Sequence, residues 1–241
     1  MQRIIQVLAG AIAVIFIFTP HEFAHAFAAY KCGDPTAKMR GRMTLNPIKH
    51  LDPIGYALCI FAGFGWAKPV PINPYNFRKY RSGLFLTAIA GVVTNYIFAF
   101  VAYPLSLLVK LLYVTNYAFF AEYIIFDFLV QILYYSLNLI FVYGLNVVIF
   151  NLLPLYPLDG FRVVEAFTRE FNPVRRFLRS YGQMILMLLV LDSFLCGILI
   201  EFVPVTSDIV QYFNILGYVQ YFGTKILGFP ISALWNLIIS V

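Results

Sequence analysis

Charged residues are scarce in this chain. Asp, Glu, Lys and Arg together make up 12% of the 241 residues, whereas apolar residues make up 61% and aromatic residues 18%. A soluble domain of this length does not need so much apolar surface, and long apolar runs with few charges are typical of membrane-spanning helices. The composition therefore predicts an all-α polytopic membrane protein.

Cysteine is also rare, with three residues in the chain. Cys32, Cys59 and Cys196 are widely separated and form no C-x-x-C motif. This spacing indicates neither a disulfide framework nor a thiolate zinc site. We expect the three thiols to be small apolar fillers.

The net charge of +6 is not distributed as in a nucleic-acid-binding protein, so no nucleic-acid partner is expected. Nine of the seventeen Lys and Arg residues lie between 31 and 81, and five more lie between 162 and 179. Both segments flank apolar spans, which is the pattern of the positive-inside rule. We expect these loops on the cytoplasmic side, near anionic lipid headgroups, with the N-terminus outside and any functional site beside the loops entered from the cytoplasm.

The apolar runs predict about five or six transmembrane helices in a single domain, 1–241, and the segments between them are too short for an appended soluble domain of ordinary size. The run at 118–153 would measure roughly 54 Å as a helix, so part of it should extend beyond the bilayer. The segment 56–74 is too short to span and predicts a re-entrant or β-hairpin-like element. The expected spans are 4–30, 84–109, about 131–150, 182–203 and 209–240, the last either one kinked helix or two short ones.

The first span ends in the motif H-E-x-x-H, formed by His21, Glu22 and His25. Histidines four residues apart share one face of a helix and can hold one metal ion, while the adjacent glutamate can act as general base on a metal-bound water. Zinc fits this donor set best. Ionisable groups at membrane depth are costly, which favours a working site over a chance match. Thr19-Pro20, just before the motif, predicts either a kink or a helix restart with Thr19 as N-cap.

A catalytic zinc ion needs a third protein ligand. His50, Asp34, Asp52, Asp159 and several glutamates are candidates. Asp159 follows two prolines in the stretch "NLLPLYPLDGFR", where an irregular backbone can turn a carboxylate into the bundle. An aspartate that caps a cytoplasmic loop is the competing interpretation.

Together these motifs resemble the site-2 protease family of intramembrane zinc metalloproteases. The likeness rests on H-E-x-x-H, on "NLLPLYPLDG" about 130 residues later, and on the stretches "GRMTLNPIKHLDPIG" and "GWAKPVPINPYNFR". It implies one zinc ion per chain on His21, His25 and Asp159, with Glu22 as the base. It also implies a catalytic core at about 4–165, followed by C-terminal helices at 182–241.

The stretch "AGVVTN" matches the family's G-x-x-x-N motif, and the resemblance gives Asn95 the role of an oxyanion donor. Packing between helices through Gly91 and Asn95 is the alternative. The extended piece containing Val70, Ile72 and Asn73 is a candidate substrate-binding edge for an unwound chain.

The resemblance implies a zinc endopeptidase that hydrolyses peptide bonds within or near transmembrane helices. Its expected partners are transmembrane protein or peptide substrates and membrane lipids, with a homo-oligomer or a regulatory membrane partner as further possibilities. A non-proteolytic zinc-binding regulator and a zinc transporter are the alternatives. The intact Glu22 disfavours the regulator, and a transporter should repeat its ligands along a path across the bilayer.

Overall fold

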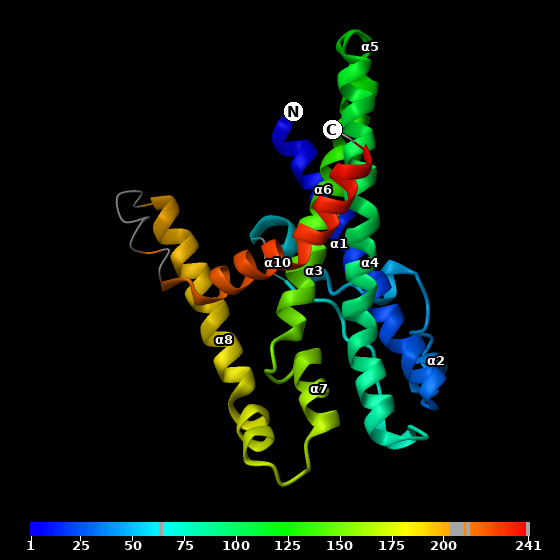
Figure 1. Ribbon diagram of the computed structural model, residues 1–241, viewed down its shortest axis with the longest axis vertical. Helices are drawn as coiled ribbons and strands as arrows, with labels where there is room; N and C mark the ends of the chain where they lie inside the picture. Colours follow the sequence, from blue (N-terminus) through cyan, green and yellow to red (C-terminus); the bar gives the residue numbers. More distant parts are fainter. Residues whose placement is uncertain (63–64, 203–209, 211–212, 240–241) are drawn as a thin grey trace.

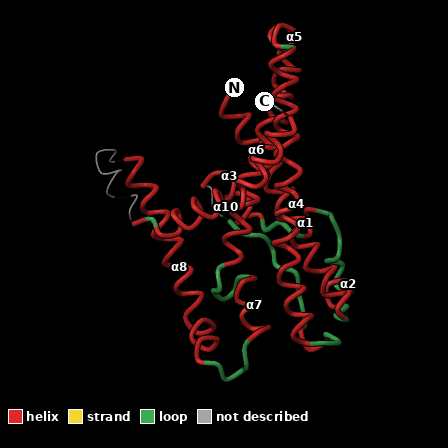
Figure 2. The backbone as a smooth tube through the Cα atoms, viewed as in Figure 1, coloured by secondary structure: helices red, strands yellow, loops and turns green. Residues whose placement is uncertain are grey.

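The computed structural model describes residues 1–62, 65–202, 210 and 213–239 (Figure 1). Five helices are long and apolar enough to cross a membrane. They are α1 (Gln2–Cys32), α4 (Tyr80–Thr115), α6 (Ile124–Leu152), α8 (Pro173–Phe202) and α10 (Ile215–Ile239). The described part of the chain contains no β-strand, so the prediction of an all-α membrane fold with about five or six spans is confirmed, with five (Figure 2).

Helices α1, α4 and α6 form the centre of the bundle. Buried small residues at their contacts, Ala13 on α1 and Ala102 on α4, let the backbones approach closely, and Ile17 and Ile140 fill the remaining space. Because α4 is 36 residues long, about 54 Å, it exceeds the ~30 Å of a hydrocarbon core. Figure 1 shows the α4–α5–α6 hairpin projecting beyond the other helices, with α5 (Tyr117–Glu122) at its tip.

Helix α1 continues without interruption through Pro20. Proline lacks one N–H and thus removes one helical hydrogen bond, but the packing of α1 against α4 and α6 holds the helix together on both sides. The restart at Thr19 is therefore wrong. The helix ends at Cys32, and Gly33 follows in the left-handed region with φ of 114°.

The segment after α1 contains α2 (Thr36–Met39), the 3₁₀ turn η1 (Pro47–Lys49) and α3 (Pro53–Ala62). Helix α3 has ten residues, about 15 Å, which is too short to span a bilayer. Residues 65–73 are extended and meet the earlier loop through one isolated antiparallel bridge between Leu51 and Ala67. The described residues of 56–74 thus form a short helix and an extended chain, and the β-hairpin alternative is wrong.

Two further elements complete the site region: η2 (Pro74–Asn76), which precedes α4, and α7 (Asp159–Phe167), which packs against α4. Helices α8 and α10 lie at the periphery, and α8 stands apart from the central bundle in Figure 1. Helix α10 is one helix that contains Pro230 and changes direction along its length, as the kinked alternative predicted. All three cysteines are free.

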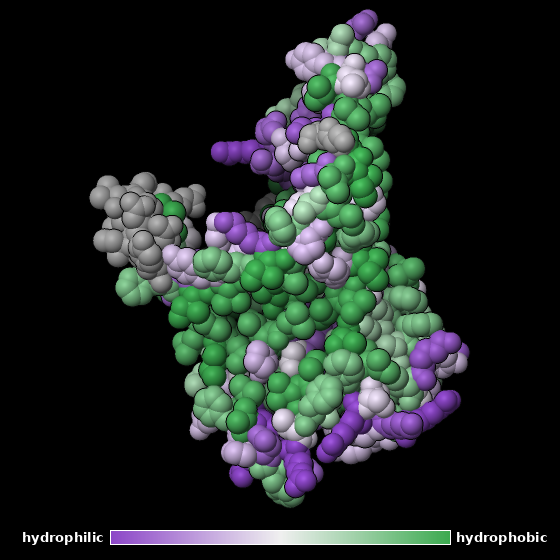
Figure 3. Space-filling view, in the orientation of Figure 1, coloured by the Kyte–Doolittle hydropathy of each residue, from purple (hydrophilic) through white to green (hydrophobic). Residues whose placement is uncertain are grey.

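A broad hydrophobic band covers the middle of the molecule in Figure 3. Hydrophilic side chains gather below it, where α4 begins and where α7 leads into α8. Lys79 immediately precedes α4, and Arg175, Arg176 and Arg179 lie in the first two turns of α8.

Candidate metal centre

Helix α1 brings two imidazole rings together inside the bundle. His21 and His25 are one turn apart on the same face, and both are buried. Their Nε2 atoms lie 2.9 Å apart. The predicted pairing of the two histidines is therefore present in the fold.

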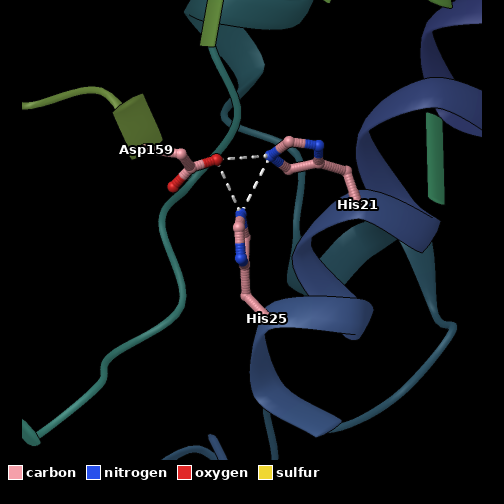
Figure 4. Close-up of side chains that lie close together, drawn as sticks. All are labelled: His21, His25 and Asp159. Carbon is pink, nitrogen blue, oxygen red and sulfur yellow. Dashed lines mark hydrogen bonds and ion pairs between the residues drawn. The ribbon is translucent and has the colours of Figure 1, made fainter. Parts of the chain in front are cut away.

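Asp159 is the first residue of α7 and faces both rings (Figure 4). Its Oδ2 atom lies 3.3 Å from His21 Nε2 and 3.1 Å from His25 Nε2. The chain reaches this point after α6 ends at Leu152, through an irregular link that contains Pro154 and Pro157. The next residue, Gly160, lies so close to α6 that an added Cβ would be 2.4 Å from the carbonyl oxygens of Leu152 and Leu153. The fold thus presses the start of α7 against the end of α6 and aims the carboxylate at the histidines.

Two of the three converging atoms, His25 Nε2 and Asp159 Oδ2, present lone pairs to each other with no hydrogen between them. His25 Nδ1 lies 2.7 Å from the Thr87 carbonyl, which only accepts hydrogen bonds, so in the neutral ring Nδ1 carries the hydrogen and Nε2 the lone pair. Asp159 Oδ2 is buried without a hydrogen-bond donor. Lone pairs that face one another in a buried site are stabilised by a cation.

The spacing of these atoms is close to that of a zinc-ligand set and slightly shorter. Ligand atoms at the usual 2.0–2.2 Å from a tetrahedral zinc ion are about 3.4 Å apart. The three observed separations are 2.9, 3.1 and 3.3 Å. Within the described residues, His21, His25 and Asp159 form the one group of three or more potential metal ligands. A series of such groups across the bundle, as a zinc transporter would need, is absent from this part of the chain.

Helix α4 lies directly behind the two rings. The Thr87 carbonyl contacts His25, and the carboxamide of Asn95 lies 3.1 Å from His21 Nδ1. A Cβ atom added to Gly91 would be 2.6 Å from His21 Cε1 and from His25 Nε2. Only glycine at this position lets α4 approach the histidines so closely.

Glu22 is held by the extended segment 65–73. Its Oε2 atom accepts a hydrogen bond from the main-chain N–H of Val70, at 2.8 Å. Glu22 lines the same cavity as His21, His25 and Asp159, which has a volume of about 420 Å³. The wall of this cavity comes from α1, Cys59 of α3, the segment 65–72, α6, the link that leads into α7, the start of α7 and Gln220 of α10.

The structure separates the three predicted substrate-binding residues. Val70 and Ile72 line the cavity, although Val70 is largely buried. Asn73 does not line it; its side chain accepts a hydrogen bond from the Tyr75 N–H and begins η2. Its own N–H donates to Asp34 Oδ2 at 2.7 Å. Asn73 therefore has a structural contact that explains its presence.

The other candidates for the third ligand are engaged elsewhere. His50 is buried, and its Nε2 lies 2.6 Å from the Thr44 carbonyl. Asp52 accepts hydrogen bonds from the N–H groups of Ile54 and Gly55 at the start of α3. Asp34 binds Thr36, Asn73 and Asn76. None of these three side chains contacts the histidine pair.

Two contacts at the site involve main-chain atoms that the sequence analysis did not anticipate. These are the Thr87 carbonyl on His25 and the Val70 N–H on Glu22. Almost every residue carries the same main-chain groups, so the pattern of side chains in a sequence does not predict these contacts. Gly91 did carry a signal, because it is the glycine of G-x-x-x-N.

Comparison with known proteins gives a consistent set of relatives. The family model described as Peptidase family M50 matches residues 9–192. The "Putative zinc metalloprotease YwhC" of Bacillus subtilis (strain 168) is 47% identical over 154 residues, which is 64% of this chain and 66% of that protein. The "Putative zinc metalloprotease Rip2" of Mycobacterium tuberculosis (strain ATCC 35801 / TMC 107 / Erdman) is 24% identical over 203 residues, which is 80% of this chain and 71% of that protein.

A further relative, the "Putative zinc metalloprotease Rip2" of Mycolicibacterium smegmatis (strain ATCC 700084 / mc(2)155), is 27% identical over 158 residues, 64% of this chain and 53% of that protein. The chain thus matches just under two thirds of the length of YwhC. No solved structure matches the chain with statistical significance. The matched range 9–192 contains every residue that meets at the cluster of His21, His25 and Asp159.

Proposed function

The chain belongs to peptidase family M50, and we propose that it is a zinc-dependent endopeptidase of the membrane that hydrolyses peptide bonds within or near transmembrane helices. The observation that carries this proposal is the convergence of His21, His25 and Asp159 on one point of a cavity that Glu22 also lines. The resemblance of the sequence to the site-2 proteases and the names of the curated relatives support the same activity.

In this proposal His21, His25 and Asp159 hold one zinc ion per chain. When bound, zinc activates water near neutral pH and polarises a peptide carbonyl. Glu22 serves as the general base that takes a proton from the attacking water and passes it to the leaving amine. The Val70 N–H fixes the Glu22 carboxylate at the cavity wall, which favours one geometry for this proton transfer.

The substrate in this proposal is a transmembrane helix that has locally unwound, because a helix satisfies its own carbonyls internally. The unwound chain lies along 69–72, whose residues Pro69, Val70 and Ile72 line the cavity. Prolines at 69 and 71 have no N–H, and the N–H groups of Val70 and Asn73 are already engaged. The Ile72 N–H is therefore the amide of this described segment that is available to a substrate strand.

For the orientation in the membrane, we propose that the end carrying both basic segments faces the cytoplasm. Lys79 and Arg81 lie at the start of α4, and Arg162 of the second basic segment lines the cavity itself. Water then reaches the site from that side, past Arg162.

The test of this function measures zinc content and cleavage on the same purified samples. Wild type, Glu22→Gln and Asp159→Ala are each incubated with a generic transmembrane substrate in detergent or liposomes. Wild type should bind one zinc ion and cleave, Glu22→Gln should bind zinc without cleaving, and Asp159→Ala should lose zinc. Asp127→Ala is the matched control, because Asp127 binds Tyr113 and Gln131 on the far part of the α4–α6 hairpin and should retain both properties.

Two results would decide against the protease. If Glu22→Gln cleaves as well as wild type, the hydrolytic assignment of Glu22 is wrong. If wild type binds zinc but cleaves none of a panel of transmembrane substrates, the non-proteolytic regulator becomes the better explanation.

A further inference from the structure

Helix α4 presents Thr87, Gly91 and Asn95 to the site at intervals of one helical turn. Thr87 contacts the Nδ1 atom of His25 through its carbonyl, and Asn95 contacts the Nδ1 atom of His21 through its side chain. Gly91, between them, leaves room for both rings. One face of α4 thus touches the two ring nitrogens that point away from Asp159.

The position of these contacts determines which nitrogen can bind metal. An imidazole that offers a lone pair at Nε2 carries its hydrogen at Nδ1, and that hydrogen needs an acceptor when it is buried. The Thr87 carbonyl is this acceptor for His25. For His21, the nearby group is the Asn95 carboxamide.

Asn95 has a free acceptor for this hydrogen. Its Oδ1 atom is buried and has no hydrogen-bond partner, while its Nδ2 atom lies 3.1 Å from His21 Nδ1. The two ends of a carboxamide have the same shape, so a half-turn of the amide places Oδ1 on the His21 N–H without moving any neighbour. The half-turn pairs Oδ1 with the His21 hydrogen and moves Nδ2 to the position where Oδ1 has no partner.

The same geometry separates Asn95 from the substrate. Asn95 is fully buried and does not line the cavity that contains Glu22 and Asp159. A donor for negative charge on the scissile carbonyl has to reach the position of that oxygen. The Asn95 side chain instead lies on the Nδ1 side of His21, away from Asp159.

We propose that Asn95 is a positioning residue: its Oδ1 accepts the Nδ1 hydrogen of His21 and so sets the tautomer and ring orientation that direct Nε2 toward Asp159. This inference rests on the proposed zinc site. It gives Asn95 the role of orienting the ligand His21, in place of the role of donating a hydrogen bond to the oxyanion. With Thr87 doing the same for His25, α4 orients both imidazole ligands. The G-x-x-x-N motif then combines close approach, from Gly91, with orientation, from Asn95.

The test is a zinc-affinity series on the full chain in detergent, measured by competition with a chromogenic chelator. The variants are Asn95→Ala, which removes the acceptor, and Asn95→Asp, which keeps it. Asn138→Ala is the control, because Asn138 is another asparagine of the bundle and bonds only to the Tyr134 carbonyl of its own helix. Visible absorption of the Co²⁺-loaded proteins provides a second readout that reports ligand geometry, and a melting curve of each metal-free variant reports folding.

Loss of an outer hydrogen bond to a histidine ligand typically weakens metal binding 10- to 100-fold. Asn95→Ala should show a loss of about this size and an altered Co²⁺ spectrum, whereas Asn95→Asp and Asn138→Ala should stay within a few-fold of wild type. Asn95→Ala that binds zinc like wild type but no longer cleaves substrate would overturn the proposal in favour of a contact with the substrate. Equal zinc loss in Asn95→Ala and Asn95→Asp would also overturn it, because the acceptor would then be irrelevant. A wild type that binds no zinc would refute the proposed function itself.

Discussion

Glu22 and Val70 are joined by a hydrogen bond of 2.8 Å from the Val70 N–H to Glu22 Oε2. The bond connects helix α1 with the extended segment 65–73, and its partners are 48 positions apart in the chain. The position of the proposed base therefore depends directly on the proposed substrate-binding segment. A change in the backbone of this segment should therefore displace Glu22 more than it displaces the proposed metal ligands.

Val70→Pro should reduce the rate of cleavage about 10- to 100-fold and leave zinc content unchanged. Proline removes the N–H that fixes Glu22, and a misplaced base loses much of its contribution to the rate. Val70→Ala keeps the N–H and is the control for the lost side chain. Initial rates on a transmembrane substrate, with zinc content on the same samples, test this. Equal rates for Val70→Pro and Val70→Ala would show that the Val70 N–H is not needed.

Ile72→Pro separates the substrate edge from this effect. Because the Ile72 N–H has no acceptor in the structure, proline there removes a donor that only a substrate strand would use. Cleavage of a transmembrane substrate should fall severalfold through KM, with zinc content unchanged, while Ile72→Val should behave as wild type. Unchanged KM in Ile72→Pro would exclude pairing of the substrate at this edge.

Gly91→Ala should greatly weaken zinc binding and lower stability by about 1–3 kcal/mol, as overpacking of a buried contact does. The added methyl would lie 2.6 Å from atoms of both histidine rings, so the rings or α4 must move. Gly10→Ala is the matched control, since it is also a buried helical glycine but has no atom within 4 Å of an added Cβ. Zinc affinity and melting temperature of both variants test the prediction. A Gly91→Ala protein with wild-type zinc affinity would contradict the close packing of α4 on the site.

Asp34 should make the protein less stable in acid. Burial acts to raise the pKa of this carboxyl, but hydrogen bonds from Thr36, Asn76 and the Asn73 N–H outweigh it and hold the pKa below its ordinary value. A lowered folded-state pKa gives stability that is complete above the unfolded-state pKa of about 3.9 and is lost as the pH falls through the folded-state value. The melting temperature of wild type should therefore exceed that of Asp34→Asn at pH 7, and the difference should shrink below about pH 4. A difference that does not change with pH would show that the charge of Asp34 contributes no stability.

The sequence predicted the centre of this fold because its signals are periodic and local. A spacing of four residues placed His21 and His25 on one helix face, and apolar runs located the five long helices. The role of Asp159 needed the resemblance to a family, because its approach depends on the link after α6 and on Gly160 fitting against Leu152 and Leu153. Such tertiary fits have no local pattern.

The remaining differences have similar causes. Helix α1 continues through Pro20 because its packing against α4 and α6 outweighs the low helix propensity of proline. Residues 53–62 became a helix because Asp52 caps its first N–H groups. The site roles of Glu22, Asn95 and the three proposed ligands remain predictions until the zinc and cleavage measurements are made.

The prolines at 69, 71 and 74 have a consequence for self-association. An exposed extended segment with regular N–H groups is a template on which other chains can stack and aggregate. In this segment the prolines and the contacts to Glu22 and Asp34 leave only the Ile72 N–H in the described stretch 69–73. A single free N–H group can form one hydrogen bond with a substrate strand. It cannot support the repeated main-chain hydrogen bonds that an aggregating strand would need.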